Sequence, residues 1–133
     1  MQARRRVLVA ALVVAVGLLV AAAPALSFIT GLTANPTATL SVNGTAATVS
    51  GTVQCEPGNA FVAARLGQGS GRSFTEASSE IDFVCDGTVQ PWSFILSTPQ
   101  GAKWKPGKAT LGAFAEDADN FIEIQTTVRL TKG

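Results

Sequence analysis

Lysines and an indole stand together in one short segment and form the first candidate binding site. Lys103, Trp104, Lys105 and Lys108 combine positive charge with an aromatic ring. Such a set can hold an anionic cell-wall polymer, a lipid headgroup or a sugar ring. The competing interpretation is structural, with Trp104 folded back to cap the core while the lysines keep the loop soluble. The sequence leaves both interpretations open.

Oxygen ligands form a second candidate site, and they are spread over three separate segments. They are Glu56, Asp86, Glu116, Asp117, Asp119 and Asn120. Calcium takes about six to eight oxygen ligands, so the set can form a calcium site only if the three loops converge. No loop has the regular ligand spacing of a known calcium motif, and solvated turn residues are the competing interpretation. Beyond this candidate metal site we expect no cofactor.

The composition excludes several kinds of catalysis. The chain of 133 residues contains no His, which removes Ser-His-Asp catalysis, His metal ligation and imidazole pH switching. A Ser-Lys arrangement has no supporting spacing. Two carboxylates hydrolyse a glycosidic bond only across a substrate groove, and a small β domain offers little groove. We therefore expect no enzyme, with a small cell-wall hydrolase that uses a carboxylate pair as the remote alternative.

The N-terminal segment has the pattern of a signal peptide. Arg4–Arg6 precede a long apolar run, and small-x-small cleavage sites end at Ala25 and Ser27. We expect cleavage after Ser27, so that residues 1–27 are the signal peptide and residues 28–133 are one secreted or extracytoplasmic domain. The apolar run is also long enough to act as an uncleaved anchor, the only membrane contact that the sequence predicts.

Removing the leader reverses the sign of the net charge. The three arginines of the leader reduce ten basic residues to seven against nine acidic ones, so the exported part carries −2 instead of +1. An acidic balance disfavours nucleic-acid binding. Because we also expect the domain to be exported, we expect its unknown ligand in the envelope or outside the cell. The sequence leaves the oligomeric state open.

A period of two between apolar and polar residues runs through the exported part and predicts strands. We expect seven, at residues 36–42, 46–55, 60–67, 79–85, 88–97, 108–115 and 121–131. Asn43-Gly44 predicts a hairpin with a type I′ turn. The Gly/Ser-rich segment Gly67–Ser78 predicts a mobile connection. Seven short strands in about 100 residues are typical of a β-sandwich.

Cys55 and Cys85 are the only two cysteines, and both fall in phase with the apolar side of their strands. Two cysteines in an oxidising compartment predict a disulfide. Closing a loop of this length stabilises by roughly 3–4 kcal/mol in the chain-entropy account. Two thiolates without His cannot build a structural zinc site.

Residues 109–120 read ATLGAFAEDADN and are followed by a strand that ends at Leu130. This C-terminal part resembles the closing hairpin of secreted bacterial immunoglobulin-like and fibronectin-III-like domains, whose common form is an alternating strand, an Ala-x-Asp-x-x-Gly-Asn turn and a final strand. Asp119 stands where those domains usually have Gly. The resemblance implies an all-β, seven-stranded immunoglobulin-like sandwich in the fibronectin-III arrangement at a bacterial cell envelope, and it implies no chemistry.

Strand direction predicts where the loops gather. If successive strands are antiparallel, the second, fourth and sixth end on the same side of the domain, which then collects the oxygen ligands and the disulfide. The opposite end receives Arg72 and the lysine-tryptophan segment, so the domain should be a charge dipole. We expect an exported, non-catalytic binding or interaction module. The alternative is a small-molecule or lipid carrier with an apolar site between the sheets, supported by fold analogy alone.

Overall fold

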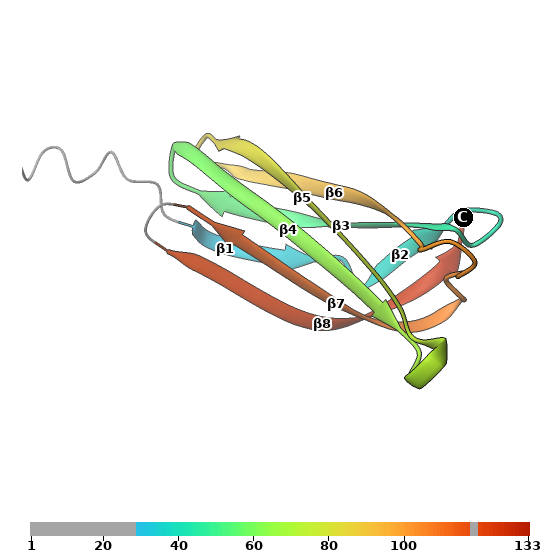
Figure 1. The fold of residues 1–133 in the computed structure, drawn as a ribbon. Helices are drawn as coiled ribbons and strands as arrows, with labels where there is room; N and C mark the ends of the chain where they lie inside the picture. Colours follow the sequence, from blue (N-terminus) through green and yellow to red (C-terminus); the bar gives the residue numbers. More distant parts are fainter. Residues whose placement is uncertain (1–28, 118–119) are drawn as a thin grey trace, which may run out of the picture.

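The computed structural model describes residues 29–117 and 120–133, which form an all-β, sandwich-like fold (Figure 1). The strands are β1 (Ile29–Ala34), β2 (Thr37–Leu40), β3 (Ala46–Cys55), β4 (Gly58–Gln68), β5 (Thr75–Cys85), β6 (Val89–Ser97), β7 (Gly107–Glu116) and β8 (Phe121–Lys132). A 3-10 turn, η2 (Gly71–Ser73), joins β4 to β5. Within the described ranges, no helix has the length and hydropathy needed to span a bilayer. The predicted signal peptide and Asp119 lie outside the described residues.

Backbone pairing arranges the strands in two layers that β2 joins. Strand β3 pairs antiparallel with β1 and β2 on one edge and with β6 on the other. The other layer has the order β8-β7-β4-β5, with antiparallel neighbours. Because β2 also pairs in parallel with β8, it belongs to both layers. One face of each layer is therefore directed inward and the other outward.

The core fills the space between the layers with the apolar residues of the alternating pattern. In β6, Trp92, Phe94 and Leu96 are buried while the intervening residues are mostly exposed. The second layer contributes Val62 and Leu66 from β4, and both are fully buried. Alternation therefore selects the inner face of each strand, as a pleated backbone requires.

Strand boundaries differ from the prediction at two places. Strand β1 is additional and precedes the first expected strand, so the described part has eight strands instead of seven. Half of the expected mobile connection Gly67–Ser78 is strand, because β4 and β5 pair without interruption from Gly58↔Cys85 to Gln68↔Thr75. The predicted connection was too long, because hairpin pairing outweighs the local Gly/Ser composition. The mobility of residues 69–74 stays a prediction.

The hairpin between β2 and β3 also has a different turn from the one expected. The Ser41 N–H donates to the Ala46 carbonyl at 2.9 Å, so four residues form the loop. A type I′ turn needs positive φ at both central residues, but only Gly44 has it, at +74°. The Asn43 side chain closes the turn instead, accepting from the Thr45 N–H and hydroxyl. The type I′ prediction was wrong.

The disulfide is present and joins the layers. Cys55 ends β3 and Cys85 ends β5, with a Cα–Cα distance of 5.5 Å between them. Buried at 1% and 2% exposure, the two cysteines belong to the core, as their phase in the sequence predicted. A covalent link between strands of different layers holds one end of the sandwich closed.

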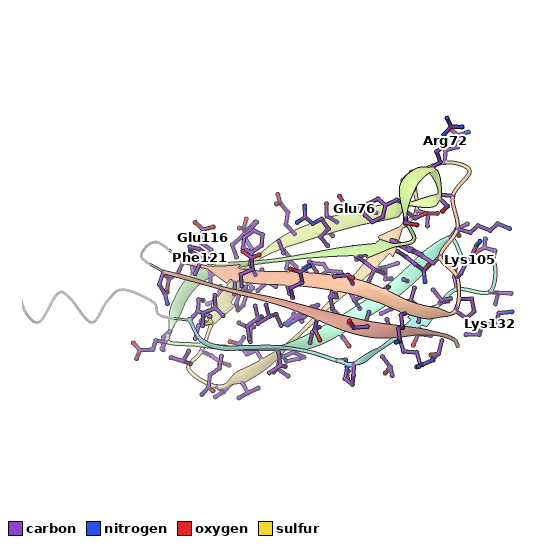
Figure 2. The ribbon with its side chains drawn as sticks, turned by 90° about the horizontal axis from the view of Figure 1, so that it is seen from below. Arg72, Glu76, Lys105, Glu116, Phe121 and Lys132 are labelled. Carbon is purple, nitrogen blue, oxygen red and sulfur yellow. A yellow bond between two sulfur atoms is a disulfide. The ribbon has the colours of Figure 1, made fainter. Side chains whose placement is uncertain are left out.

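The strand directions confirm the expected separation of the loops. Strands β3, β5 and β7 point to the same end of the domain (Figure 1). We call this end the acidic pole, defined by Glu56, Asp86, Glu116 and Asp117. The opposite end is the lysine pole, defined by Arg72, Lys103, Lys105, Lys108 and Lys132. Figure 2 shows Glu116 at one end and Arg72, Lys105 and Lys132 at the other.

Candidate binding surface

Trp104 lies in the core and fastens the segment that carries the lysines. Its side chain is 2% exposed, and its Nε1–H donates to the Leu96 carbonyl at 3.0 Å. Its backbone N–H donates to the Gly44 carbonyl at 2.8 Å. The burial favours the structural interpretation of Trp104, because a buried indole is not offered to a ligand. Lys103, Lys105 and Lys108 are exposed and stay candidate ligand contacts.

The Gln68 side chain also holds the backbone around these lysines. We call residues 98–108 the lysine loop. The Gln68 amide nitrogen donates to the carbonyls of Lys105 and Lys108, at 2.8 and 3.1 Å. Its amide oxygen accepts from the Lys105 N–H at 2.8 Å. Three hydrogen bonds from the end of β4 therefore fix the loop in place without using any lysine side chain.

A hollow of about 340 Å³ lies between the lysine loop and the turn from β4 to β5. We call it the lysine pocket. Its lining combines the three lysines with small and polar residues, namely Gln68, Gly69, Ser73, Thr75, Lys103, Lys105, Pro106 and Lys108. Ammonium groups on a fixed backbone can receive an anionic group without the entropy cost of ordering the loop backbone, although the lysine side chains still lose rotamer freedom.

At the acidic pole, Asp86 stabilises the turn to which it belongs. One carboxylate oxygen, Oδ1, accepts from the Thr88 hydroxyl at 2.6 Å and from the Thr88 N–H at 2.8 Å. Hydrogen bonds to the charged form favour it. The Thr88 hydroxyl, followed by the Thr88 N–H, therefore holds the pKa of Asp86 below its ordinary value. The Gly87 N–H donates to the Cys55 carbonyl, which brings the turn beside the end of β3.

Asp117 and Asn120 close the turn between β7 and β8. The Asn120 N–H donates to Asp117 Oδ1 at 2.9 Å, and the Asp117 N–H donates to the Asn120 carbonyl at 3.0 Å. The Asn120 side chain also bonds the backbone of Ile29 at the start of β1. These groups therefore have a structural role in the loops of the acidic pole.

The calcium candidate gains no geometric support. Among residues 29–117 and 120–133, no group of three or more Asp, Glu, Cys or His side chains could hold a metal ion. The structure does bring Glu56 and Asp86 to neighbouring loops, and it places Glu116 and Asp117 at the same pole. Asp119, the remaining carboxylate of the predicted set, lies outside the described residues.

The outer face of the second layer contains a larger feature that the sequence did not predict. Across four paired strands, one row reads Ser78 on β5, Arg65 on β4, Gly112 on β7 and Gln125 on β8. A Cβ placed on Gly112 would have no heavy atom within 4 Å. The bare glycine beside an exposed arginine leaves the centre of this face hollowed.

Two adjoining hollows occupy this face, of about 630 and 470 Å³. They share Arg65, Gly112 and Glu123 in their linings, and we call them together the outer-face hollow. Phenyl rings stand at both ends. Phe74 is 50% exposed and lies over Gly67, where an added Cβ would meet the ring at 3.0 Å. Phe114 is paired with Phe61 at a centroid distance of 5.5 Å.

The sequence could have suggested some residues of this hollow, but not how they are aligned. Gly67 and Gly112 interrupt strands, and glycine inside a strand often marks a close approach or a space for a ligand. Their alignment with Arg65 depends on the register of β4 against β5 and β7, which hydrophobic alternation does not specify. Arg65 is therefore a candidate binding residue that the sequence interpretation missed.

Comparison with known proteins adds no assignment. The sequence matches no protein-family model and has no significant similarity to a curated protein. The function is therefore argued from the surface of the domain itself.

Proposed function

We propose that this chain is an exported, non-catalytic binding module that holds an extended polar ligand in the outer-face hollow. The observation that carries the proposal is the open space above Gly112 beside exposed Arg65, bounded by two phenyl rings. A concave surface with a few convergent polar groups and apolar walls is typical of ligand sites. The predicted signal peptide and the Cys55–Cys85 bridge support export to an oxidising compartment.

An immunoglobulin-like sandwich in the fibronectin-III arrangement is part of the proposal. One layer contains β1, β3 and β6, and the other contains β5, β4, β7 and β8. This division supports the fibronectin-III type, with β2 as the strand that passes between the layers. The proposed domain thus presents the outer face of its four-stranded layer to the ligand.

The acids of the hollow stand on backbone positions that are far apart. The carboxylates that line the hollow are Glu76, Glu80 and Glu123. Three strand spacings, about 14 Å between backbones, separate Glu80 from Glu123, and four residues, about 13 Å along β5, separate Glu76 from Glu80. Glycoside hydrolysis places its two carboxyl groups about 5–9.5 Å apart, and glutamates on these strands would have to lean toward each other to reach that range. The backbone spacing therefore gives the remote hydrolase alternative no direct support.

The carrier alternative also lacks a supporting observation. The space between the layers is filled by side chains such as Val49, Val62 and Leu66, each 0–1% exposed. The outer-face hollow and the lysine pocket lie outside this core. A ligand held between the sheets would have to displace well-packed side chains.

Filling the hollow tests the proposed function. The exported protein would be sedimented with isolated envelopes of the exporting cell, and the bound molecule would be identified by mass spectrometry. We expect Gly112→Phe to weaken this binding about tenfold with little change in melting temperature, because the new side chain enters open space. Arg65→Gln should weaken binding without filling the hollow.

A matched control is Ser93→Phe, which adds the same ring to an exposed position on β6 in the other layer. This variant should bind as the wild type does. Unchanged envelope binding by both Gly112→Phe and Arg65→Gln, in folded protein, would contradict the outer-face hollow as the binding surface.

A further inference from the structure

The lysine pocket and the outer-face hollow adjoin each other. Gln68, Gly69 and Lys108 contribute to the lining of both. From the lysine pole, the lining passes Phe74 and Arg65 and reaches Phe114 in the second hollow. A ligand of several linked units can therefore extend from the lysines along the outer face of β4 and β7.

The outer-face hollow has the chemistry of a carbohydrate site. Its floor offers hydroxyl, amide and guanidinium groups from Thr110, Gln125, Thr127 and Arg65, which can bind sugar hydroxyls as donors or acceptors. The exposed ring of Phe74 can stack on the apolar face of a sugar ring. Glu76 and Glu123 add acceptors for further hydroxyl groups.

Other chain-like ligands fit this surface less well. A peptide usually gains affinity by adding a strand to a free sheet edge, but β4 and β7 are each paired on both sides. A nucleic acid carries a phosphate at every unit, and Glu76, Glu80 and Glu123 would repel such a backbone along the hollow. The observations thus favour a mainly neutral polar chain.

Positive charge is concentrated at one end of this surface. Lys103, Lys105 and Lys108 line the lysine pocket together with the small polar residues Ser73 and Thr75. Three like charges in one pocket suit a phosphate or carboxylate group. The loop is already fastened by Trp104 and Gln68, so binding an anion there requires little reorganisation.

We propose that the lysine pocket is an anion subsite, and that the ligand is a carbohydrate chain bearing one phosphate or carboxylate group, with its sugar rings in the outer-face hollow. This inference rests on the proposed binding function of the hollow and names the class of its ligand. The anionic group sets the direction of the chain, because three lysines gather at one end of the surface, whereas Arg65 in the hollow is accompanied by carboxylates.

Calorimetric titration of the exported protein with three matched probes tests this assignment. The probes are one linear oligosaccharide in neutral form, in phosphorylated form and with a terminal uronate. We expect the charged forms to bind about tenfold more tightly than the neutral form at about 50 mM salt, and this preference to shrink at about 500 mM salt because ions screen exposed lysines. Comparison of the phosphorylated and uronate forms identifies the preferred anion.

The triple variant Lys103→Gln/Lys105→Gln/Lys108→Gln should remove the preference. The double variant Lys103→Gln/Lys105→Gln keeps Lys108, which also lines the outer-face hollow, and should reduce the preference while leaving the affinity for the neutral form unchanged. Lys132→Gln, an exposed cation at the same pole but outside the pocket lining, is the control and should keep the preference. Gly112→Phe should weaken all three probes.

The outcomes separate this inference from the proposed function. A preference that survives in the triple variant overturns the anion subsite, while loss of binding in Gly112→Phe still supports the hollow. Unchanged binding in Gly112→Phe, with binding abolished in the triple variant, overturns the function of the hollow itself. Failure of the wild type to bind any of the three probes, or binding only to phosphatidylglycerol vesicles, overturns the carbohydrate assignment.

Discussion

The two poles of the sandwich carry opposite charges and use them differently. At the acidic pole, Asp86 and Asp117 accept hydrogen bonds within their own turns. At the lysine pole, Trp104 and Gln68 hold the loop, and the lysine side chains are exposed around a pocket. Charged side chains that hold their own turns together, as at the acidic pole, support the fold. Where other residues hold the loop backbone, as at the lysine pole, the charged side chains can contact a ligand.

The two poles are also stabilised by different interactions. A disulfide closes the acidic pole by linking β3 to β5, while a buried indole closes the lysine pole by packing under its loop. Each pole also has a glutamine that bridges backbone groups. Gln68 holds the lysine loop, and Gln90 bonds the Val84 carbonyl and the Asp86 N–H. These parallels allow matched variants at the two ends.

The largest effect is expected from Trp104→Ala at the lysine pole. Removing a buried indole leaves a cavity and deletes the hydrogen bond to the Leu96 carbonyl, and large-to-small changes of this kind cost about 3–5 kcal/mol of unfolding free energy. Chemical denaturation would measure the loss. Trp104→Phe, which keeps much of the volume, should lose less. A loss below about 1 kcal/mol in Trp104→Ala would contradict the role of the indole as the fastening of this pole.

The matching change at the acidic pole is Cys55→Ala together with Cys85→Ala. We expect a loss of roughly 3–4 kcal/mol, because the unfolded chain regains the freedom of a loop whose ends are 30 residues apart. Denaturation of the oxidised wild type, the reduced wild type and the double variant would measure it. The two forms without the bridge should have similar stability. Free thiols in the natively exported protein would show that the covalent fastening is absent.

A smaller effect on stability, with a difference in binding, is expected from the two glutamines. Gln68→Ala and Gln90→Ala should each lose about 1 kcal/mol, since each removes neutral hydrogen bonds at the surface. Only Gln68→Ala should also weaken binding of the phosphorylated oligosaccharide, because it frees the lysine loop. Equal binding by the two variants in calorimetry would remove the distinction between the poles.

The smallest effect concerns Asp86 and pH. Because the pKa of Asp86 is held below its ordinary value by the Thr88 hydroxyl and N–H, its stabilising contribution is present at neutral pH and is lost as the pH falls through the folded-state pKa. Asp86→Asn should therefore be less stable than the wild type at neutral pH, and the difference should shrink below about pH 4. Melting curves from neutral to acid pH would measure it.

Thr88→Ala is the matched control for this measurement. Without the hydroxyl donor, the main cause of the lowered pKa is removed, and the pH at which stability is lost should move upward. A pH dependence identical in the wild type, Asp86→Asn and Thr88→Ala would show that this carboxylate does not stabilise its turn.

Local patterns predicted much of the fold. Alternation located the seven expected strands to within a few residues, except that β5 begins at Thr75 instead of residue 79. The early part of β5 was missed because its Gly/Ser-rich approach resembles a loop, and β1 was missed because its pairing with β3 is a tertiary contact. The disulfide was predicted from two cysteines in an expected oxidising compartment, and their common phase agreed with the buried position that both residues have.

The sequence by itself determined the all-β class, the disulfide and the separation of charges, because these depend on residue spacing and on the direction of successive strands. Only the tertiary structure decided that Trp104 is buried, that Gln68 fastens the lysine loop, and that Gly112 stands beside Arg65. Each of these depends on which residues of distant segments become neighbours. That choice is made by register and packing over the whole domain. A period of two in one strand decides which side chains face inward, but not which residue of a distant strand lies opposite.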